Sequence, residues 1–166
     1  MISPVMPTYA RADLAFVRGV GCWLESVDGR RFLDFGAGVA VTALGHAHPR
    51  LVEALTEQAK KLWHCSNLYR VPGQERVAKI LIEHSFADTA FFCNSGAEAM
   101  ECALKMVRKY QDAVGAPERY RCITIEGAFH GRTLATIAAG GQEKHLMGFD
   151  QVVDGYGGRP ESLVAV

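Results

Sequence analysis

The feature that most constrains the fold is an apolar run at residues 89–93 that passes into a helical pattern with almost no connector. The run ends at Asn94-Ser95-Gly96, and apolar residues then recur with helical spacing from Ala97 to about Gln111. A second apolar run follows at residues 122–125. Strand, helix and strand in this order predict an α/β fold with a parallel sheet. We expect strands near 89–93 and 122–126 to be neighbours, joined by a right-handed helical crossover.

Residues 22–62 predict a hairpin and a helix before this unit. Asp28-Gly29 separates two aromatic-bearing segments, and Gly accepts the positive φ that a tight hairpin turn requires. Pro49 suits the first turn of a helix, and the apolar residues that follow it have helical spacing. Pro72 opens a second helix in the same way. The apolar run at 162–166 ends the chain as if a sheet were incomplete there.

Composition narrows the class of protein. The 166 residues are 49% hydrophobic and 22% charged, with 18 basic and 18 acidic side chains, which gives no reason to expect a nucleic acid or a membrane as partner. The five cysteines include no CxxC pair, and His46-x-His48 lacks a nearby carboxylate or Cys partner, so no metal site is predicted. Residues 1–13 lack the pattern of a signal peptide, and no apolar run approaches the roughly 20 residues of a membrane span. We expect a reduced, cytoplasmic protein.

Two motifs carry chemistry. The turn Ser95-Gly96-Ala97 opens a helix, whose first N–H groups and partial positive charge attract a phosphate; the alternative is that Ser95 only caps the helix. After the next strand come Phe129, His130 and Arg132, which we expect at the carboxyl edge of the sheet. The Phe129 ring suits stacking on a planar heterocycle and the Arg132 guanidinium suits a carboxylate, whereas the alternatives are core packing and a surface ion pair.

Several separate segments together resemble a known family. "FFCNSGAEAMECALKMVRKY", "EGAFHGRTLATIAAGGQ", "RFLDFGAGVAVTALGHAHPRLVEAL" and "HCSNLYR" are similar to the subgroup III aminotransferases that use pyridoxal 5′-phosphate, and among these to the acetylornithine branch. The resemblance runs from about Thr8 to about Gly155. It implies the fold-type I architecture, with residues 1–45 as an N-terminal segment of the small domain and 46–166 as the first, incomplete part of the large cofactor-binding domain.

The resemblance also assigns roles. It implies that Ser95, Gly96 and Ala97 hold the cofactor phosphate, that Phe129 stacks on the pyridine ring with His130 beside it, and that Arg132 binds the substrate α-carboxylate. Val39 stands where ornithine aminotransferases carry a tyrosine, which favours the acetylornithine branch. No catalytic residue is assigned within this chain, because the lysine that forms the Schiff base in the family lies beyond residue 166.

The activity implied for a full-length homodimer is transfer of the δ-amino group of N-acetylornithine to 2-oxoglutarate, a step of arginine biosynthesis. The 166 residues alone are expected to be inactive. Ornithine, succinylornithine and 4-aminobutyrate aminotransferases remain alternatives, as does a non-enzymatic domain that binds phosphate or a partner subunit.

Overall fold

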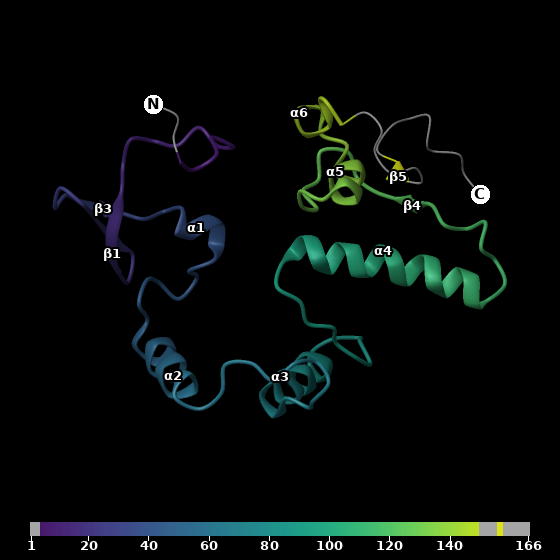
Figure 1. The fold of residues 1–166 in the computed structure, drawn as a ribbon, viewed down its shortest axis with the longest axis horizontal. Helices are drawn as coiled ribbons and strands as arrows, with labels where there is room; N and C mark the ends of the chain where they lie inside the picture. Colours follow the sequence, from purple (N-terminus) through teal and green to yellow (C-terminus); the bar gives the residue numbers. More distant parts are fainter. Residues whose placement is uncertain (1–3, 150–155, 158–166) are drawn as a thin grey trace. The chain divides into compact units, whose positions relative to one another are not determined.

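The computed structural model describes residues 4–149 and 156–157 (Figure 1). The apolar run at 162–166 and the end of the family resemblance near Gly155 lie outside the described residues. The chain divides into two compact units, Met1–Arg70 and Val71–Val166.

The first unit contains a three-stranded antiparallel sheet. Strands β1 (Phe16–Val20), β2 (Trp23–Ser26) and β3 (Arg31–Leu33) pair in that order, with Trp23 opposite Leu33 and Glu25 opposite Arg31. The predicted hairpin is confirmed: Gly29 turns between β2 and β3 with φ +81°. Strand β1 had no counterpart in the sequence prediction.

A loop at residues 45–48, just before the helix that begins at Pro49, bonds to this sheet region. His46 exchanges two backbone hydrogen bonds with Gly21, of 2.7 and 3.0 Å, and its Nε2 lies 2.6 Å from Oδ2 of Asp34. The hydrogen bond from His46 lowers the pKa of Asp34, followed in effect by the bond from the Ala37 N–H. His46 therefore links the loop to Asp34, the residue directly after β3.

Two helices complete the first unit. Helix α1 (Ala37–Ala40) is short, and Gly38 and Val39 have left-handed backbone angles within it. Helix α2 (Pro49–Ala59) begins with Pro49, as predicted.

The second unit is mainly helical. Helices α3 (Pro72–Glu83) and α4 (Gly96–Ala113) confirm the two helices predicted from Pro72 and Ala97. Short helices α5 (Leu134–Gly140) and α6 (Glu143–Leu146) follow strand β4 (Cys122–Ile123), which pairs in parallel with β5 (Tyr156–Gly157).

The predicted strand at 89–93 is wrong. Among the described residues this segment has no regular secondary structure, and β4 pairs with β5 instead. The expected parallel pairing of 89–93 with 122–126, and the crossover between them, is therefore absent from the described part of the chain. The physical reason is that an apolar run supplies side chains for a strand, but a strand also needs a neighbour that accepts and donates ladder hydrogen bonds.

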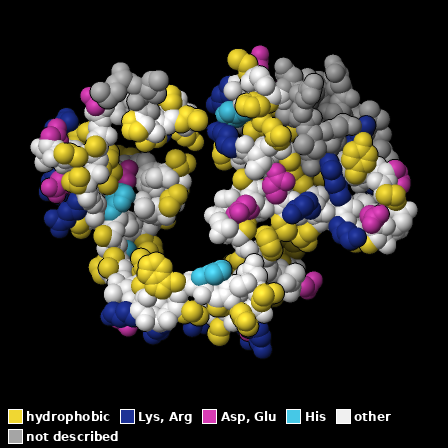
Figure 2. All heavy atoms as spheres, in the orientation of Figure 1, with side chains coloured by type: hydrophobic (Ala, Val, Ile, Leu, Met, Phe, Trp, Pro, Cys, Tyr) yellow, Lys and Arg dark blue, Asp and Glu magenta, His cyan; other side chains and the backbone are white. Residues whose placement is uncertain are grey.

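Burial is concentrated in α5. Its residues Ala135–Gly140 are all buried, and Ala139 and Thr136 have no exposed surface. Small side chains allow this close packing, since Ala and Gly place little volume between the helix and its neighbours. Elsewhere large apolar side chains lie at the surface of both units, as Figure 2 shows.

Candidate functional site

The turn before α4 is fixed by a reciprocal cap. Ser95 is the N-cap residue, and its Oγ accepts a hydrogen bond of 3.2 Å from the Glu98 N–H. The Glu98 carboxylate reaches back to the Asn94 N–H at 2.7 Å and accepts a longer bond of 3.3 Å from the Ser95 hydroxyl. The expected alternative for Ser95, helix capping, is thus what the described residues show. Bonds from Asn94, and then those from Ser95, lower the pKa of Glu98.

The cap leaves two backbone donors at the turn. Ser95 takes up the N–H of Glu98, while the helix itself offers no acceptor to the N–H groups of Gly96 and Ala97. A Cβ added at Gly96 would meet no described atom within 4 Å, so the space beside the turn is open. The N–H groups of Gly96 and Ala97, the helix dipole and an open approach form a donor set that suits an anion.

The loop at residues 126–133 packs against this turn. A Cβ added at Gly131 would lie 2.7 Å from the Ala97 Cβ and 2.9 Å from the Thr136 Oγ1, closer than real Cβ atoms come. Gly131 also has φ +131°, a value that side chains disfavour. Glycine at this position therefore lets the loop that carries Phe129, His130 and Arg132 touch the turn that carries Ala97.

Contacts at both ends hold the same loop. The Thr133 hydroxyl caps α5, in a capping box with Thr136, and donates a hydrogen bond to Oε1 of Glu101 on α4. At the other end, Gln142 Nε2 donates bonds of 3.0 Å to the carbonyl oxygens of Gly127 and Ala128. The loop is thus connected to α4 and to the segment between α5 and α6.

The side chains of the loop interact with one another. The Arg132 guanidinium carbon lies 4.5 Å from the centre of the Phe129 ring, a cation–π distance, and Nη1 donates to the Gly131 carbonyl at 3.2 Å. Phe129 is 67% exposed and His130 is half-buried. Burial lowers the pKa of His145 on α6, and the positive charges of Arg132 and Lys144 lower it further. Neither a core Phe129 nor a surface ion pair of Arg132 is what the described residues show.

Sequence reasoning missed Glu98 as the partner of Ser95, although a signal was present. Ser95 followed by Glu98 fits the S-x-x-E pattern of a capping box. It also missed Glu101 and Gln142, for which the local sequence gives no such pattern.

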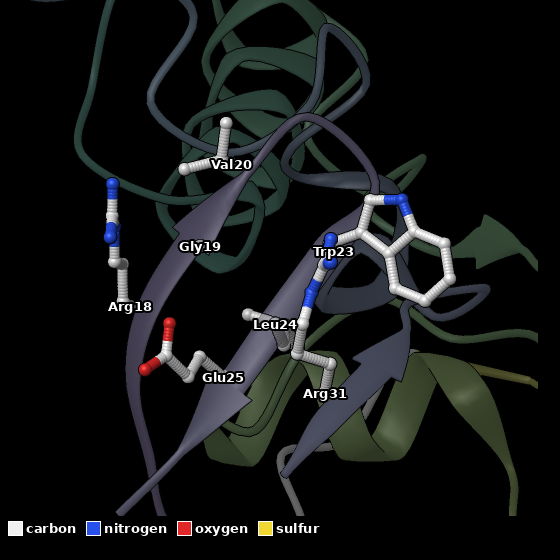
Figure 3. Close-up of a pocket in the computed structure, with 7 residues that line it drawn as sticks. All are labelled: Arg18, Gly19, Val20, Trp23, Leu24, Glu25 and Arg31. Carbon is white, nitrogen blue, oxygen red and sulfur yellow. The ribbon is translucent and has the colours of Figure 1, made fainter. Parts of the chain in front are cut away.

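A separate hollow of about 300 Å³ lies on the sheet of the first unit and contains none of the predicted site residues (Figure 3). Arg31 covers the Trp23 ring there, with its guanidinium carbon 4.8 Å from the ring centre, and Arg18 lies opposite Glu25 in the strand register. The Arg31 guanidinium is thus engaged by the Trp23 ring. Its residues therefore give no reason to assign a ligand.

The described residues include neither a metal centre nor a membrane-spanning helix. They contain no group of three or more His, Cys, Asp and Glu side chains placed to hold a metal ion. None of the helices in residues 4–149 is long and apolar enough to cross a membrane.

The family profile and the individual sequences that this chain matches all belong to one family. The sequence profile of the class-III aminotransferases matches residues 6–161. The acetylornithine aminotransferase of Agrobacterium fabrum is 62% identical over 154 residues, which cover 93% of this chain and 39% of that protein. That of Rhodobacter capsulatus is 60% identical over 156 residues, covering 94% of this chain and 40% of that protein. The chain thus spans about two fifths of the length of these relatives.

Solved structures agree with these matches. N-acetylornithine aminotransferase from Stenotrophomonas maltophilia is 46% identical with a TM-score of 0.68, over 74% of this chain and 34% of that one. An aminotransferase from Bacillus anthracis is 29% identical with a TM-score of 0.84, over 93% of this chain and 35% of that one.

Proposed function

Because this chain belongs to the class-III aminotransferase family, we propose that it supplies the cofactor-phosphate and substrate-carboxylate contacts of an acetylornithine aminotransferase. The predicted family is confirmed, and the fold is part of the fold-type I architecture of pyridoxal-phosphate transaminases. The observation that carries the proposal is the contact between Gly131 and Ala97, which unites the two motifs.

Class-III aminotransferases use pyridoxal 5′-phosphate, and the residues present fit that cofactor. The N–H groups of Gly96 and Ala97 and the open space at Gly96 suit its phosphate. The Ser95 hydroxyl has one hydrogen, which points to Glu98 at 3.3 Å, so it can join the phosphate only by leaving that long bond. When bound, the cofactor supplies an electron sink for bond breaking at the substrate carbon.

The loop residues complete the proposed site. Phe129 is largely exposed, and one face of its ring would cover the cofactor ring. The Arg132 guanidinium carbon lies 4.5 Å from the centre of the Phe129 ring. His130 lies beside the ring. The Arg132 guanidinium holds the α-carboxylate of the substrate through a pair of charge-assisted hydrogen bonds.

The family takes small-molecule amino donors and oxo acids. For this chain we propose transfer of the δ-amino group of N-acetylornithine to 2-oxoglutarate, in arginine biosynthesis, by a cytoplasmic homodimer. The names of the relatives at about 60% identity support this donor over ornithine, succinylornithine or 4-aminobutyrate. The boundary at residues 45/46 between small-domain and large-domain segments is part of the same proposal.

The test is a full-length hybrid, in which this chain is joined at the end of its matched region to the remaining part of the Agrobacterium fabrum enzyme. We expect the hybrid to bind pyridoxal 5′-phosphate and to prefer acetylornithine among the four amino donors. The parent enzyme is the positive control. A folded hybrid that binds the cofactor but transfers no amino group from acetylornithine would contradict the proposal.

Arg132→Lys in this hybrid tests the carboxylate contact. Lys offers a point charge in place of a planar fork, and a hydrogen bond between charged groups is worth about 1.5–3 kcal/mol. We expect kcat/KM to fall roughly 10- to 100-fold for acetylornithine and for glutamate, with cofactor absorbance retained. Unchanged kinetics with both substrates would remove Arg132 from the site.

A further inference from the structure

The loop at residues 126–133 must keep a fixed course if Phe129 and Arg132 are to meet a ligand. Phe129 and Arg132 are exposed, so packing around their side chains does little to hold them. Functional side chains on loops are held in place by the contacts of the loop backbone and by supporting residues. The backbone just before Phe129 therefore needs a support.

Gln142 makes two hydrogen bonds at that point. Its Nε2 donates to the Gly127 carbonyl at 3.0 Å and to the Ala128 carbonyl at 3.0 Å, so both hydrogens of the amide are used on consecutive peptide groups. Both partners are acceptors, which fixes the nitrogen end of the Gln142 amide toward the loop. Two bonds from one side chain constrain the orientation of this stretch as well as its distance.

Gln142 itself stands on a rigid support. It follows Gly141, which ends α5 in the left-handed conformation with φ +58°, and it is the N-cap residue of α6. Helix α5 is buried throughout Ala135–Gly140. The Gly140 carbonyl accepts the Gly127 N–H at 2.9 Å, and a Cβ added at Gly140 would lie 2.8 Å from the Ala128 oxygen. The start of the loop therefore lies directly against the end of α5.

We propose that Gln142 is a positioning residue that sets the course of the loop carrying Phe129 and Arg132. Gln142 holds the loop one residue before Phe129, and the contact of Gly131 with Ala97 holds it one residue before Arg132. The short stretch between these two points has little freedom left. Gln142 acts through the loop backbone and touches neither cofactor nor substrate. This inference rests on the proposed function for its consequence in catalysis, although the support itself is a property of the fold.

The test compares Gln142→Met with wild type in the full-length hybrid. Met keeps the length of the side chain and removes the two donated bonds. In the cofactor-free protein we expect backbone amides of residues 126–133 to exchange with solvent about tenfold faster, the effect of losing roughly one net hydrogen bond. Amides of α4 beyond its first turn should not change. Gln142→Glu should give a larger effect, because it places a carboxylate against two carbonyl oxygens.

Gln58→Met is the matched control, since Gln58 Nε2 likewise donates to a backbone carbonyl, that of Leu62 at 2.8 Å. It should leave exchange at 126–133 unchanged. In the loaded hybrid, Gln142→Met should raise KM for both acetylornithine and 2-oxoglutarate about tenfold. The thermal midpoint should shift by only a few degrees.

Each measurement either supports or overturns the role of Gln142. Exchange at 126–133 within about twofold of wild type, or an equal change in Gln58→Met, would overturn the role of Gln142. A lower thermal midpoint with unchanged KM values would also overturn it, because support of the fold alone would then suffice. If wild-type hybrid has no transaminase activity, the proposed function fails while the exchange measurement still decides this inference. If Gln142→Glu does not fold, Gln142→Met alone still tests the role of Gln142.

Discussion

Helix α5 is largely buried and helix α2 is exposed, although the apolar face of α2 suggests the reverse. Helix α2 has eleven residues with a strong apolar face, yet within the described part of the chain it has no buried residue, and Leu55 is 72% exposed. Helix α5 has seven residues, mostly Ala and Gly, and Ala135–Gly140 are all buried. Amphipathic spacing identifies a helix, but burial depends on what covers it.

The covering elements explain the difference. Helix α5 lies under the loop at 126–133, where Thr136 is close to Gly131 and the Gly140 carbonyl bonds to Gly127. The apolar face of α2 lines an open hollow of about 360 Å³, together with Val41 and Leu44. The best-packed part of the second unit is thus the part that supports the candidate site.

The same substitution in both helices tests this contrast and should give its largest effect. Ala139 has no exposed surface, so Ala139→Leu must push apart packed neighbours and should destabilise the hybrid by about 1–3 kcal/mol. Ala54→Leu on α2 is the control, because Ala54 is exposed, and should change the stability by less than about 0.5 kcal/mol. Urea unfolding measures both. Equal effects would show that α5 is no better packed than α2.

The pH dependence of the α4 cap should be a smaller effect. The pKa of Glu98 is lowered in the folded protein, chiefly by bonds from Asn94, so its contribution to stability is present above the unfolded pKa and is lost as the pH falls through the folded pKa. Glu98→Gln should therefore destabilise the protein at neutral pH and match wild type in acid. Thermal midpoints of both proteins across pH 2 to about 7 measure this. A difference that persists unchanged in acid would contradict the assignment.

A polar residue on the exposed face of α2 should have the smallest effect. Leu55→Gln leaves the helix propensity nearly unchanged and loses little buried surface, since Leu55 is largely exposed. We expect a change of less than about 0.5 kcal/mol in the first unit, measured by urea unfolding of the hybrid. A loss above about 2 kcal/mol would mean that this face is covered in the full-length protein.

The parts of the fold predicted from the sequence were those with local signals. Pro49 and Pro72 marked helix starts and Asp28-Gly29 marked a hairpin, because each acts through the backbone of its own neighbourhood. The strand at 89–93 failed because strand formation depends on a partner elsewhere in the chain.

The candidate site divides in the same way. Ser95 and Gly96 are predicted as site residues from the helix start, and Phe129 and Arg132 from their place after a strand. The supports were not predicted, because Gln142 acts over 15 residues and Glu101 pairs with Thr133 over 32. Contacts at such separations leave no local pattern. The contact of Ser95 with Glu98 is local, and its S-x-x-E pattern could have been recognised in the sequence.

The proposed site depends on the contact of Ala97 in the α4 turn with Gly131 in the loop at 126–133. A double-mutant cycle in the hybrid measures this contact. Gly131→Ala adds a Cβ 2.7 Å from the Ala97 Cβ. Ala97→Gly removes that Cβ, while the Cα of residue 97 at 3.0 Å and Thr136 Oγ1 at 2.9 Å still resist. We predict a coupling of about 0.5–3 kcal/mol in unfolding free energy, with the double variant binding pyridoxal 5′-phosphate more tightly than Gly131→Ala alone. Effects that add within about 0.3–0.5 kcal/mol in both measurements would contradict the contact, and with it the single site.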